Sequence, residues 1–170
     1  MQRRTVAIAA IAVILLASVA AAIVDSRRGG DGASGTTPVT SMDQLAATYV
    51  ATSTYATPQP LADLGAIHVS FDGDRVSVST GCNVLGFTAH LESSRLVQTS
   101  AASMTEMGCE PARTAQQDLL AAAFAEGVRL ELSGPYLSIH WGPVTNGAAA
   151  YSLGLTDQAW LASGTSTPTG

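Results

Sequence analysis

Apolar and polar residues alternate with a period of two in several short segments of this chain. Ile67, Val69 and Phe71 share one side of the first segment, and residues 75–79 repeat the pattern after Asp72-Gly73. Such alternation is typical of strands with one buried face, and an Asp-Gly pair between two strands predicts a tight hairpin. The remaining strand-like segments are residues 87–91, 96–97, 128–132, 137–141 and 149–153, with a second turn signal at Asn146-Gly147.

One segment has a helical pattern instead. Residues 111–126 begin with Pro111, which suits the first turn of a helix because its missing N–H is not needed there. Glu110 suits the positive end of the helix dipole, and Gly127 permits a backbone conformation that ends a helix. The apolar stripe, with three- and four-residue spacing, consists of Ala115, Leu119, Leu120, Ala122 and Phe124. We therefore predict one principal helix.

Short antiparallel strands with one inserted helix predict a mainly β (α+β) fold. A compact antiparallel sheet that curls, or closes into a small barrel, buries one face of every strand when the helix packs on it. The large side chains expected to fill the interior are Ile67, Phe71, Phe87, Phe124, Leu137 and Trp141. A filled interior argues against an internal cavity, which the first alternative function, a small-ligand carrier with a β-barrel, requires.

The N-terminal end differs in composition from the rest of the chain. Residues 5–24 carry no charge and are long enough to cross about 30 Å of hydrocarbon as a helix. We therefore predict that residues 1–24 are a signal peptide, or a signal anchor that forms a single transmembrane helix. The run Ala20-Ala21-Ala22 suits signal peptidase, whereas the length of the apolar run favours a retained anchor. The expected location is the cell membrane with an extracytoplasmic domain, or secretion after cleavage.

Two further segments lack the apolar residues that a core requires. Residues 25–37 are rich in Gly, Ser, Thr and charge and are predicted to form a flexible linker. Residues 163–170 have a similar composition and are predicted to be a disordered tail. The domain itself then covers residues 38–162, about 125 residues, which is enough for one hydrophobic core.

Charge excludes one class of partner. Outside residues 1–24 the chain has six arginines and thirteen acidic residues, a net charge of −7. An acidic domain repels phosphate backbones, so we expect no nucleic-acid partner. The expected partners are the membrane, through the N-terminal segment, and an unknown envelope protein or small ligand.

Cys82 and Cys109 are the only cysteines. In an oxidising compartment their expected fate is one disulfide, which would restrict the unfolded chain and stabilise the fold by about 3 to 4 kcal/mol. Two alternatives stay open, namely two buried free thiols, or a nucleophilic Cys82 oriented by Asn83 with a histidine as base. The candidate bases are His68, His90 and His140. Because no spacing requires a catalytic pair, we expect no enzymatic activity.

Two short motifs surround the cysteines, Gly81-Cys82-Asn83 and the segment MTEMGC at residues 104–109. Together with Gly86-Phe87 at the start of a strand, and with the order of elements over residues 43–155, they resemble the META domain family, which includes HslJ-like heat-shock proteins. The family usually opens with a tryptophan in its first strand, where Tyr49 is the nearest candidate here. Its usual Met-Ala-Cys is replaced by Met107-Gly108-Cys109.

The resemblance implies a compact, mostly β domain without established catalytic chemistry, linked to stress tolerance, envelope integrity or, in some parasites, virulence. The motif residues that it marks as structural are Gly81, Asn83, Gly86 and Thr105. Gly81 and Asn83 both tolerate positive φ and suit a turn. The Thr105 hydroxyl suits capping or bonding to a neighbouring strand, with a ligand contact as the alternative. We predict an exported domain with a non-catalytic binding or structural function.

No metal or cofactor is expected. The histidines are far apart and lack ligand spacing, and Asp72-Gly73-Asp74 lacks the later ligands of a calcium loop. The sequence contains no phosphate-binding loop, dinucleotide fingerprint or nucleophile elbow. The second alternative function is an inhibitor or adaptor that presents residues 51–60, a polar segment containing Pro58 and Pro60, to another protein.

Overall fold

The computed structural model describes residues 35–164. The predicted signal segment at residues 1–24 lies outside the described residues, as do residues 25–34 of the predicted linker and residues 165–170 of the predicted tail. No helix within residues 35–164 combines the length and the apolar character that a membrane crossing requires.

The described chain is built mainly from antiparallel strands, with one 16-residue helix and three short helices. The barrel strands are β2 (Thr48–Ala56), β3 (Ile67–Asp72), β4 (Arg75–Thr80), β5 (Val84–Glu92), β6 (Arg95–Gln98), β8 (Val128–Ser133), β9 (Tyr136–Thr145) and β10 (Ala148–Asp157). The short strands are β1 (Thr37–Pro38) and β7 (Ser103–Met104), and the helices are η1 (Met42–Gln44), η2 (Leu64–Ala66), α2 (Pro111–Glu126) and α3 (Gln158–Ala162).

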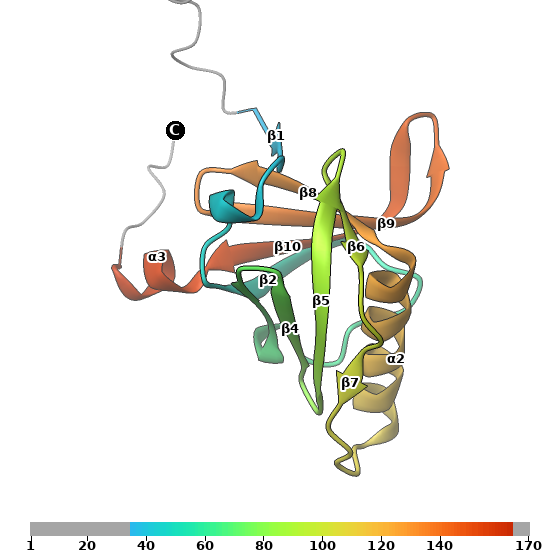
Figure 1. The fold of residues 1–170 in the computed structure, drawn as a ribbon. Coiled ribbons are helices and arrows are strands. Elements are labelled where there is room, and N and C mark those ends of the chain that lie inside the picture. The colour runs from blue at the N-terminus through green and yellow to red at the C-terminus, as the bar shows by residue number, and fades with distance from the viewer. Residues whose placement is uncertain (1–34, 165–170) are drawn as a thin grey trace, which may run out of the picture. The chain divides into compact units, whose positions relative to one another are not determined.

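The sheet closes on itself. Strands pair in the order β8, β6, β5, β4, β3, β2, β10 and β9, and β9 pairs back with β8 (Figure 1). The predicted hairpins are confirmed, with Asp72 opposite Arg75 and Thr145 opposite Ala148. The mainly β fold is therefore a closed eight-stranded antiparallel barrel with one principal helix, which confirms the predicted fold class.

The barrel interior is filled by the inward side chains of its strands. Successive side chains on a strand point to opposite faces, so every second residue enters the core. All six large side chains that the sequence predicted for the interior are buried in one continuous core: Ile67, Phe71, Phe87, Phe124, Leu137 and Trp141. This packing leaves the outer surface and the strand ends as places for binding.

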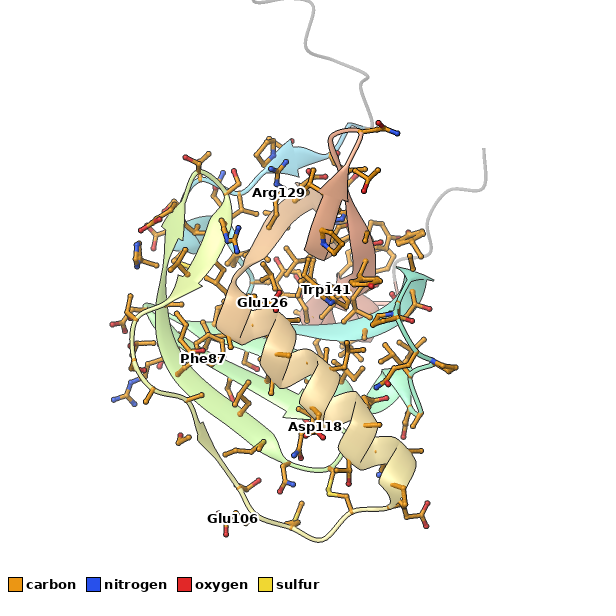
Figure 2. All side chains as sticks on the ribbon, turned by 90° about the vertical axis from the view of Figure 1, so that its right-hand side faces the viewer. Phe87, Glu106, Asp118, Glu126, Arg129 and Trp141 are labelled. Atoms are coloured by element: carbon orange, nitrogen blue, oxygen red, sulfur yellow. A yellow bond between two sulfur atoms is a disulfide. The ribbon has the colours of Figure 1, made fainter. Side chains whose placement is uncertain are left out.

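Helix α2 packs on the barrel where the sheet is weakest. Strands β6 and β8 share only the pairs Arg95 with Arg129 and Leu96 with Val128. The helix contacts β4, β6 and β9 and lies diagonally across the face shown in Figure 2. The Phe124 ring lies 5.7 Å from the Phe87 ring, centroid to centroid. The helix therefore covers the core beside the short β6–β8 seam.

The buried face of α2 differs from the predicted stripe. Leu120 and Phe124 are buried as predicted, but Ala122 is exposed, and Gln116 and Gln117 take part in the buried face. The prediction failed because it followed apolar residues only. Gln116, Leu120 and Phe124 recur at four-residue spacing, so the glutamine lies in phase with the core residues.

The segment that the second alternative function treats as a projecting loop is mostly strand. Residues 51–56 belong to β2 and pair with β10, so the interpretation of residues 51–60 as a presented loop is corrected. The part that follows the strand is tied to the helix, because Gln59 Nε2 donates to the Ala115 carbonyl at 2.8 Å. A nine-residue β2 was missed because Ser and Thr hid the alternation in its second half.

Tyr49, the nearest candidate for the tryptophan that the resemblance leads one to expect, lies in β2. The side chain is buried, packs edge-on against Phe71, and its hydroxyl accepts a hydrogen bond from Ala46 N at 3.0 Å. Burial raises the pKa of the Tyr49 phenol above its ordinary value of 10.0, and the hydrogen bond from Ala46 opposes this only in part.

This environment predicts a stability difference that grows at alkaline pH. Tyr49→Phe should lower the free energy of unfolding by about 1 kcal/mol at pH 8, because the buried hydrogen bond is lost. Since the folded-state pKa is raised, the contribution of the neutral phenol is complete below the unfolded pKa near 10.0 and is lost as pH rises above it. Between pH 8 and a pH above 10, the free energy of unfolding measured with urea should decline less for Tyr49→Phe than for the wild-type protein. Tyr55→Phe, at an exposed tyrosine, is the control; equal declines for Tyr49→Phe and wild type would contradict the assignment.

Candidate functional site

The Gly-Cys-Asn motif forms the turn between β4 and β5. Gly81 has φ of +84°, and a Cβ atom there would lie 2.9 Å from Gln116 Nε2 and 3.3 Å from the Ala66 side chain. Thr80 N and Thr80 Oγ1 both donate to the Asn83 carbonyl, at 2.9 Å each. Position 81 requires glycine for two reasons, the positive φ of its backbone and the close approach of helix α2.

Asn83 connects this turn to two other segments through its buried side chain. Oδ1 accepts from Met107 N at 2.8 Å and from Thr105 Oγ1 at 2.9 Å. Nδ2 donates to Gln117 Oε1 at 2.8 Å and to the Met107 carbonyl at 3.2 Å. Because a backbone N–H can only donate, Met107 N fixes which end of the amide is oxygen. Both ends of the amide are therefore satisfied without water.

The role predicted for Asn83 needs correction. Its φ is not positive, so the residue is not present for left-handed backbone; among the described residues only Ser93, Ser94 and Asn146 are non-glycine residues with positive φ. What the position requires is a side chain that donates and accepts at once. A buried amide of this kind pins three chain segments to one another.

Thr105 and Gly86 both take part in the contacts among residues 80–86, residues 103–109 and the first turns of α2, which we call the junction. Thr105 Oγ1 donates to Asn83 Oδ1 and accepts from Val84 N at 3.0 Å, so the hydroxyl bonds a neighbouring strand as predicted. Ser103 Oγ donates to the Gly86 carbonyl at 3.2 Å, and a Cβ on Gly86 would meet that Oγ at an ordinary 3.5 Å. These contacts hold the segment from Ser103 to Cys109 against the start of β5.

The structure contains a Cys82–Cys109 disulfide, with 6.1 Å between the Cα atoms. Asn83 Nδ2 lies 3.6 Å from each sulfur. Because the two sulfurs are bonded to each other, neither is a thiolate, and the bond links the Gly81-Cys82-Asn83 turn to the residues that precede α2. The junction as a whole has the character of a structural connection, with its polar atoms paired internally.

Gln116 completes the junction from the helix side. Its side chain is fully buried, with Oε1 accepting from Asp63 N at 3.1 Å and Nε2 donating to the Thr80 carbonyl at 2.6 Å. Arg113, one turn earlier, donates to the Gly81 carbonyl at 2.8 Å and pairs with Asp63 Oδ2 at 3.3 Å. Gln116 and Arg113 thus satisfy the carbonyls of Thr80 and Gly81.

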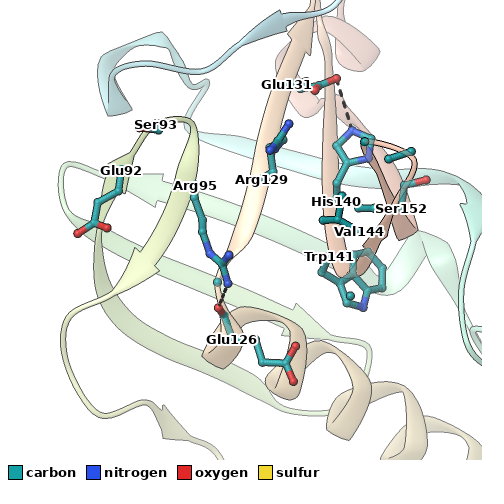
Figure 3. A pocket seen from close by; sticks show the side chains of 15 residues that line it. Glu92, Ser93, Arg95, Glu126, Arg129, Glu131, His140, Trp141, Val144 and Ser152 are labelled. Atoms are coloured by element: carbon teal, nitrogen blue, oxygen red, sulfur yellow. Dashed lines mark hydrogen bonds and ion pairs between the residues drawn. The ribbon is translucent and has the colours of Figure 1, made fainter.

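A second feature is a cleft of about 620 Å³ on the outside of the barrel (Figure 3). Its lining comes from the end of β5 and from β6, the carboxyl end of α2, β8, and the β9–β10 hairpin. The charged and aromatic lining residues are Glu92, Arg95, Glu126, Arg129, Glu131, His140 and Trp141. The register places Arg95 opposite Arg129, and Arg129 opposite His140, so one transverse row crosses three strands.

Gly127 shapes the edge of this cleft. A Cβ there would lie 2.8 Å from Arg95 Nε, and its φ is +87°. The glycine lets the Arg95 guanidinium pass over the chain and donate to the Glu126 carbonyl, the contact drawn in Figure 3. A cation at the carboxyl end of a helix is stabilised by the helix dipole.

The three histidines have separate partners, and none of these partners is a cysteine. His68 Nε2 is 3.1 Å from the Gly65 carbonyl, and His90 Nε2 is 2.7 Å from Glu92 Oε1. His140 Nε2 is buried without a hydrogen-bond partner, 3.6 Å from Glu131 Oε2. Within residues 35–164, no group of three His, Cys, Asp or Glu side chains is arranged to hold a metal ion.

The order of elements and the two cysteine motifs are those of a known family. A family model described as META domain matches residues 42–146. The chain belongs to the META domain family. This confirms the resemblance that the cysteine motifs indicated, and the matched range includes Gly81, Asn83, Gly86, Thr105 and both cysteines.

Two solved structures are similar to this META domain. One NMR structure of a protein is 20% identical, has a TM-score of 0.52, and is matched over 69% of this chain and 95% of its own. A second NMR structure, of a protein from Burkholderia xenovorans, is 16% identical with a TM-score of 0.47, over 74% of this chain and 94% of its own. The first similarity supports the fold alone. No curated protein is significantly similar to the chain.

Sequence reasoning on this META domain found the junction but missed the cleft. The junction is marked by short motifs whose members are near one another in sequence, apart from Gln116 and Gln117. The charged cleft residues are scattered over four strands and a helix end, with no shared motif. The only signal available was that Arg129 and His140 each occupy the polar side of a predicted strand.

Proposed function

We propose that this META domain is exported and acts outside the cytoplasm as a non-catalytic binding domain, held at a membrane by its N-terminal segment or released after cleavage. The observation that carries the binding role is the cleft on the outer face of the barrel, because the barrel interior is filled. A role in envelope maintenance or stress tolerance rests on the family resemblance.

The absence of catalysis is supported by how the reactive groups are used. A disulfide leaves Cys82 without a thiol for nucleophilic attack. His68 lies beside a carbonyl, and His90 and His140 lie beside carboxylates; none of the three hydrogen-bonds Cys82 or Cys109. The candidate pair of Cys82 with a histidine base therefore has no support in this geometry.

Two observations support export, the apolar run and the disulfide. Residues 5–24 are uncharged and of membrane-spanning length, and disulfides persist in oxidising compartments. The alternative function as a small-ligand carrier is not supported, because a carrier requires an internal cavity and the predicted core residues are packed together.

The proposal is tested by fusing a proximity-labelling enzyme to the C-terminus of the full chain in intact cells. We expect labelled neighbours to be envelope proteins, and cell fractionation with external protease to place the domain outside the cytoplasm. A retained anchor leaves the full-length chain in the membrane fraction, whereas cleavage leaves a shorter soluble chain. Neighbours drawn from cytoplasmic proteins, with the domain protected from external protease, would overturn the proposed location.

A further inference from the structure

Positive charge is scarce on this domain and is concentrated in the cleft. Residues 35–164 contain four arginines, Arg75, Arg95, Arg113 and Arg129, against eleven acidic residues. Two of the four, Arg95 and Arg129, line the cleft on neighbouring strands. Like charges directly opposite each other in a sheet are destabilising. This pair therefore reduces stability unless another group lies between or beside the two cations.

Most charged groups of the cleft already have partners inside the protein. Glu92 pairs with His90, Glu131 lies 3.6 Å from His140, and Arg95 bonds the Glu126 carbonyl. Two charged groups have no hydrogen bond or ion pair with any described residue, the guanidinium of Arg129 and the carboxylate of Glu126. They are of opposite sign and lie on either side of Arg95 in Figure 3.

The space beside these two charges has an apolar wall. Val144, Ala148 and Ala149 line the cleft from the β9–β10 hairpin, and the edge of the core residue Trp141, which is 6% exposed, reaches the cleft floor from β9. Val144 is 66% exposed, so its side chain is open to contact with a ligand in the cleft. A volume of about 620 Å³ lies within the range of small-ligand sites.

We propose that the cleft binds short peptides with free ends. The peptide carboxylate pairs with Arg129, whose planar guanidinium can donate two parallel hydrogen bonds to a carboxylate. The peptide ammonium pairs with Glu126, and an apolar side chain of the peptide packs against Val144 and Ala148. This inference rests on the proposed binding role and names its ligand.

The same charges disfavour other ligand classes. Three glutamates line the cleft with two arginines, so a polyanion such as nucleic acid or a polyphosphate meets net repulsion when His140 is neutral. A simple anion leaves Glu126 without a partner, and a simple cation leaves Arg129 without one. A ligand that carries one charge of each sign satisfies both groups.

The test uses the full chain purified in detergent, with Trp160→Phe as background. Trp141 is then the only tryptophan, and its fluorescence reports occupancy of the cleft. The probes are the tripeptide Ala-Phe-Ala with free ends, the same peptide with an amidated carboxyl end, and the same peptide with an acetylated amino end. Inorganic phosphate serves as the simple anion.

We expect saturable binding of the free peptide, weakened about tenfold or more by blocking either end. Arg129→Gln should weaken binding of the free peptide and remove the effect of amidation, whereas Glu126→Gln should remove the effect of acetylation. Such selective coupling distinguishes a direct contact from general damage to the fold. Matched control variants are Arg75→Gln and Glu106→Gln, which lie outside the cleft lining and should bind as wild type does.

Three outcomes would overturn the inference. These are no saturable response up to about 10 mM peptide, equal binding of free and blocked peptides, and binding of phosphate that displaces the peptide without dependence on Glu126. The result is separable from the proposed location, because binding by purified protein does not depend on where the cell places it. An exported domain that binds no peptide fails only this inference, and a peptide-binding domain found in the cytoplasm fails only the proposed location.

Discussion

Replacing Asn83 by alanine is expected to lower the free energy of unfolding by about 3 kcal/mol, because several buried polar groups lose their partners at once. Met107 N, Gln117 Oε1 and the Thr105 hydroxyl all bond the Asn83 amide. Asn83 itself is only 4% exposed, so water cannot easily replace these bonds. Urea unfolding followed by far-UV circular dichroism measures the change.

Asn83→Asp separates the two halves of the amide. The aspartate keeps the acceptor for Met107 N but has no donor for Gln117 Oε1 or for the Met107 carbonyl. A buried carboxylate beside two acceptor oxygens should be as destabilising as alanine at pH 7, and less so at acidic pH, where protonation restores one donor. Asn146→Gly is the matched control, since Asn146 lies in an exposed turn with positive φ and should change stability by less than about 0.5 kcal/mol. A stable Asn83→Ala protein would show that the amide network is dispensable.

Removing the disulfide is expected to have an effect of similar size. The double change Cys82→Ser and Cys109→Ser opens a loop between residues 27 apart in sequence, which corresponds to roughly 3 to 4 kcal/mol on the chain-entropy model. For a domain of this size the melting temperature should fall by about 10 °C. Differential scanning calorimetry of the double variant, beside reduced wild-type protein, measures the change.

The two forms should agree, because reduction and substitution open the same loop. Alkylation followed by intact-mass analysis of protein isolated from its own cells should find no free thiol. Two alkylated cysteines in that protein would contradict the disulfide in the native setting. Since Asn83 Nδ2 contacts both sulfurs, the effects of Asn83→Ala and of disulfide removal should add incompletely when combined.

The strands were predictable because their physical cause is local. Alternation along residues 67–71 and 75–79 reports which face is buried, and a two-residue turn after Asp72 fixes the register of the hairpin. Strand β2 was missed, because hydroxyl side chains on both faces of its second half removed the alternation. The principal helix was predictable in extent, yet its buried glutamines were not, since a polar residue enters a core only when distant atoms satisfy it.

By itself, the sequence determined the mainly β class, the principal helix, the family and the cysteine pair. Each of these depends on residues close together in the chain, or on a motif of a few positions such as Gly81-Cys82-Asn83. Only the tertiary structure decided that the sheet closes between β8 and β9, that Asn83 acts through its side chain, and that Arg129 and Glu126 border one cleft with Trp141. Those features depend on the register between strands that are far apart in sequence. Register is set by the packing of the whole core, and no single segment of the sequence contains that information.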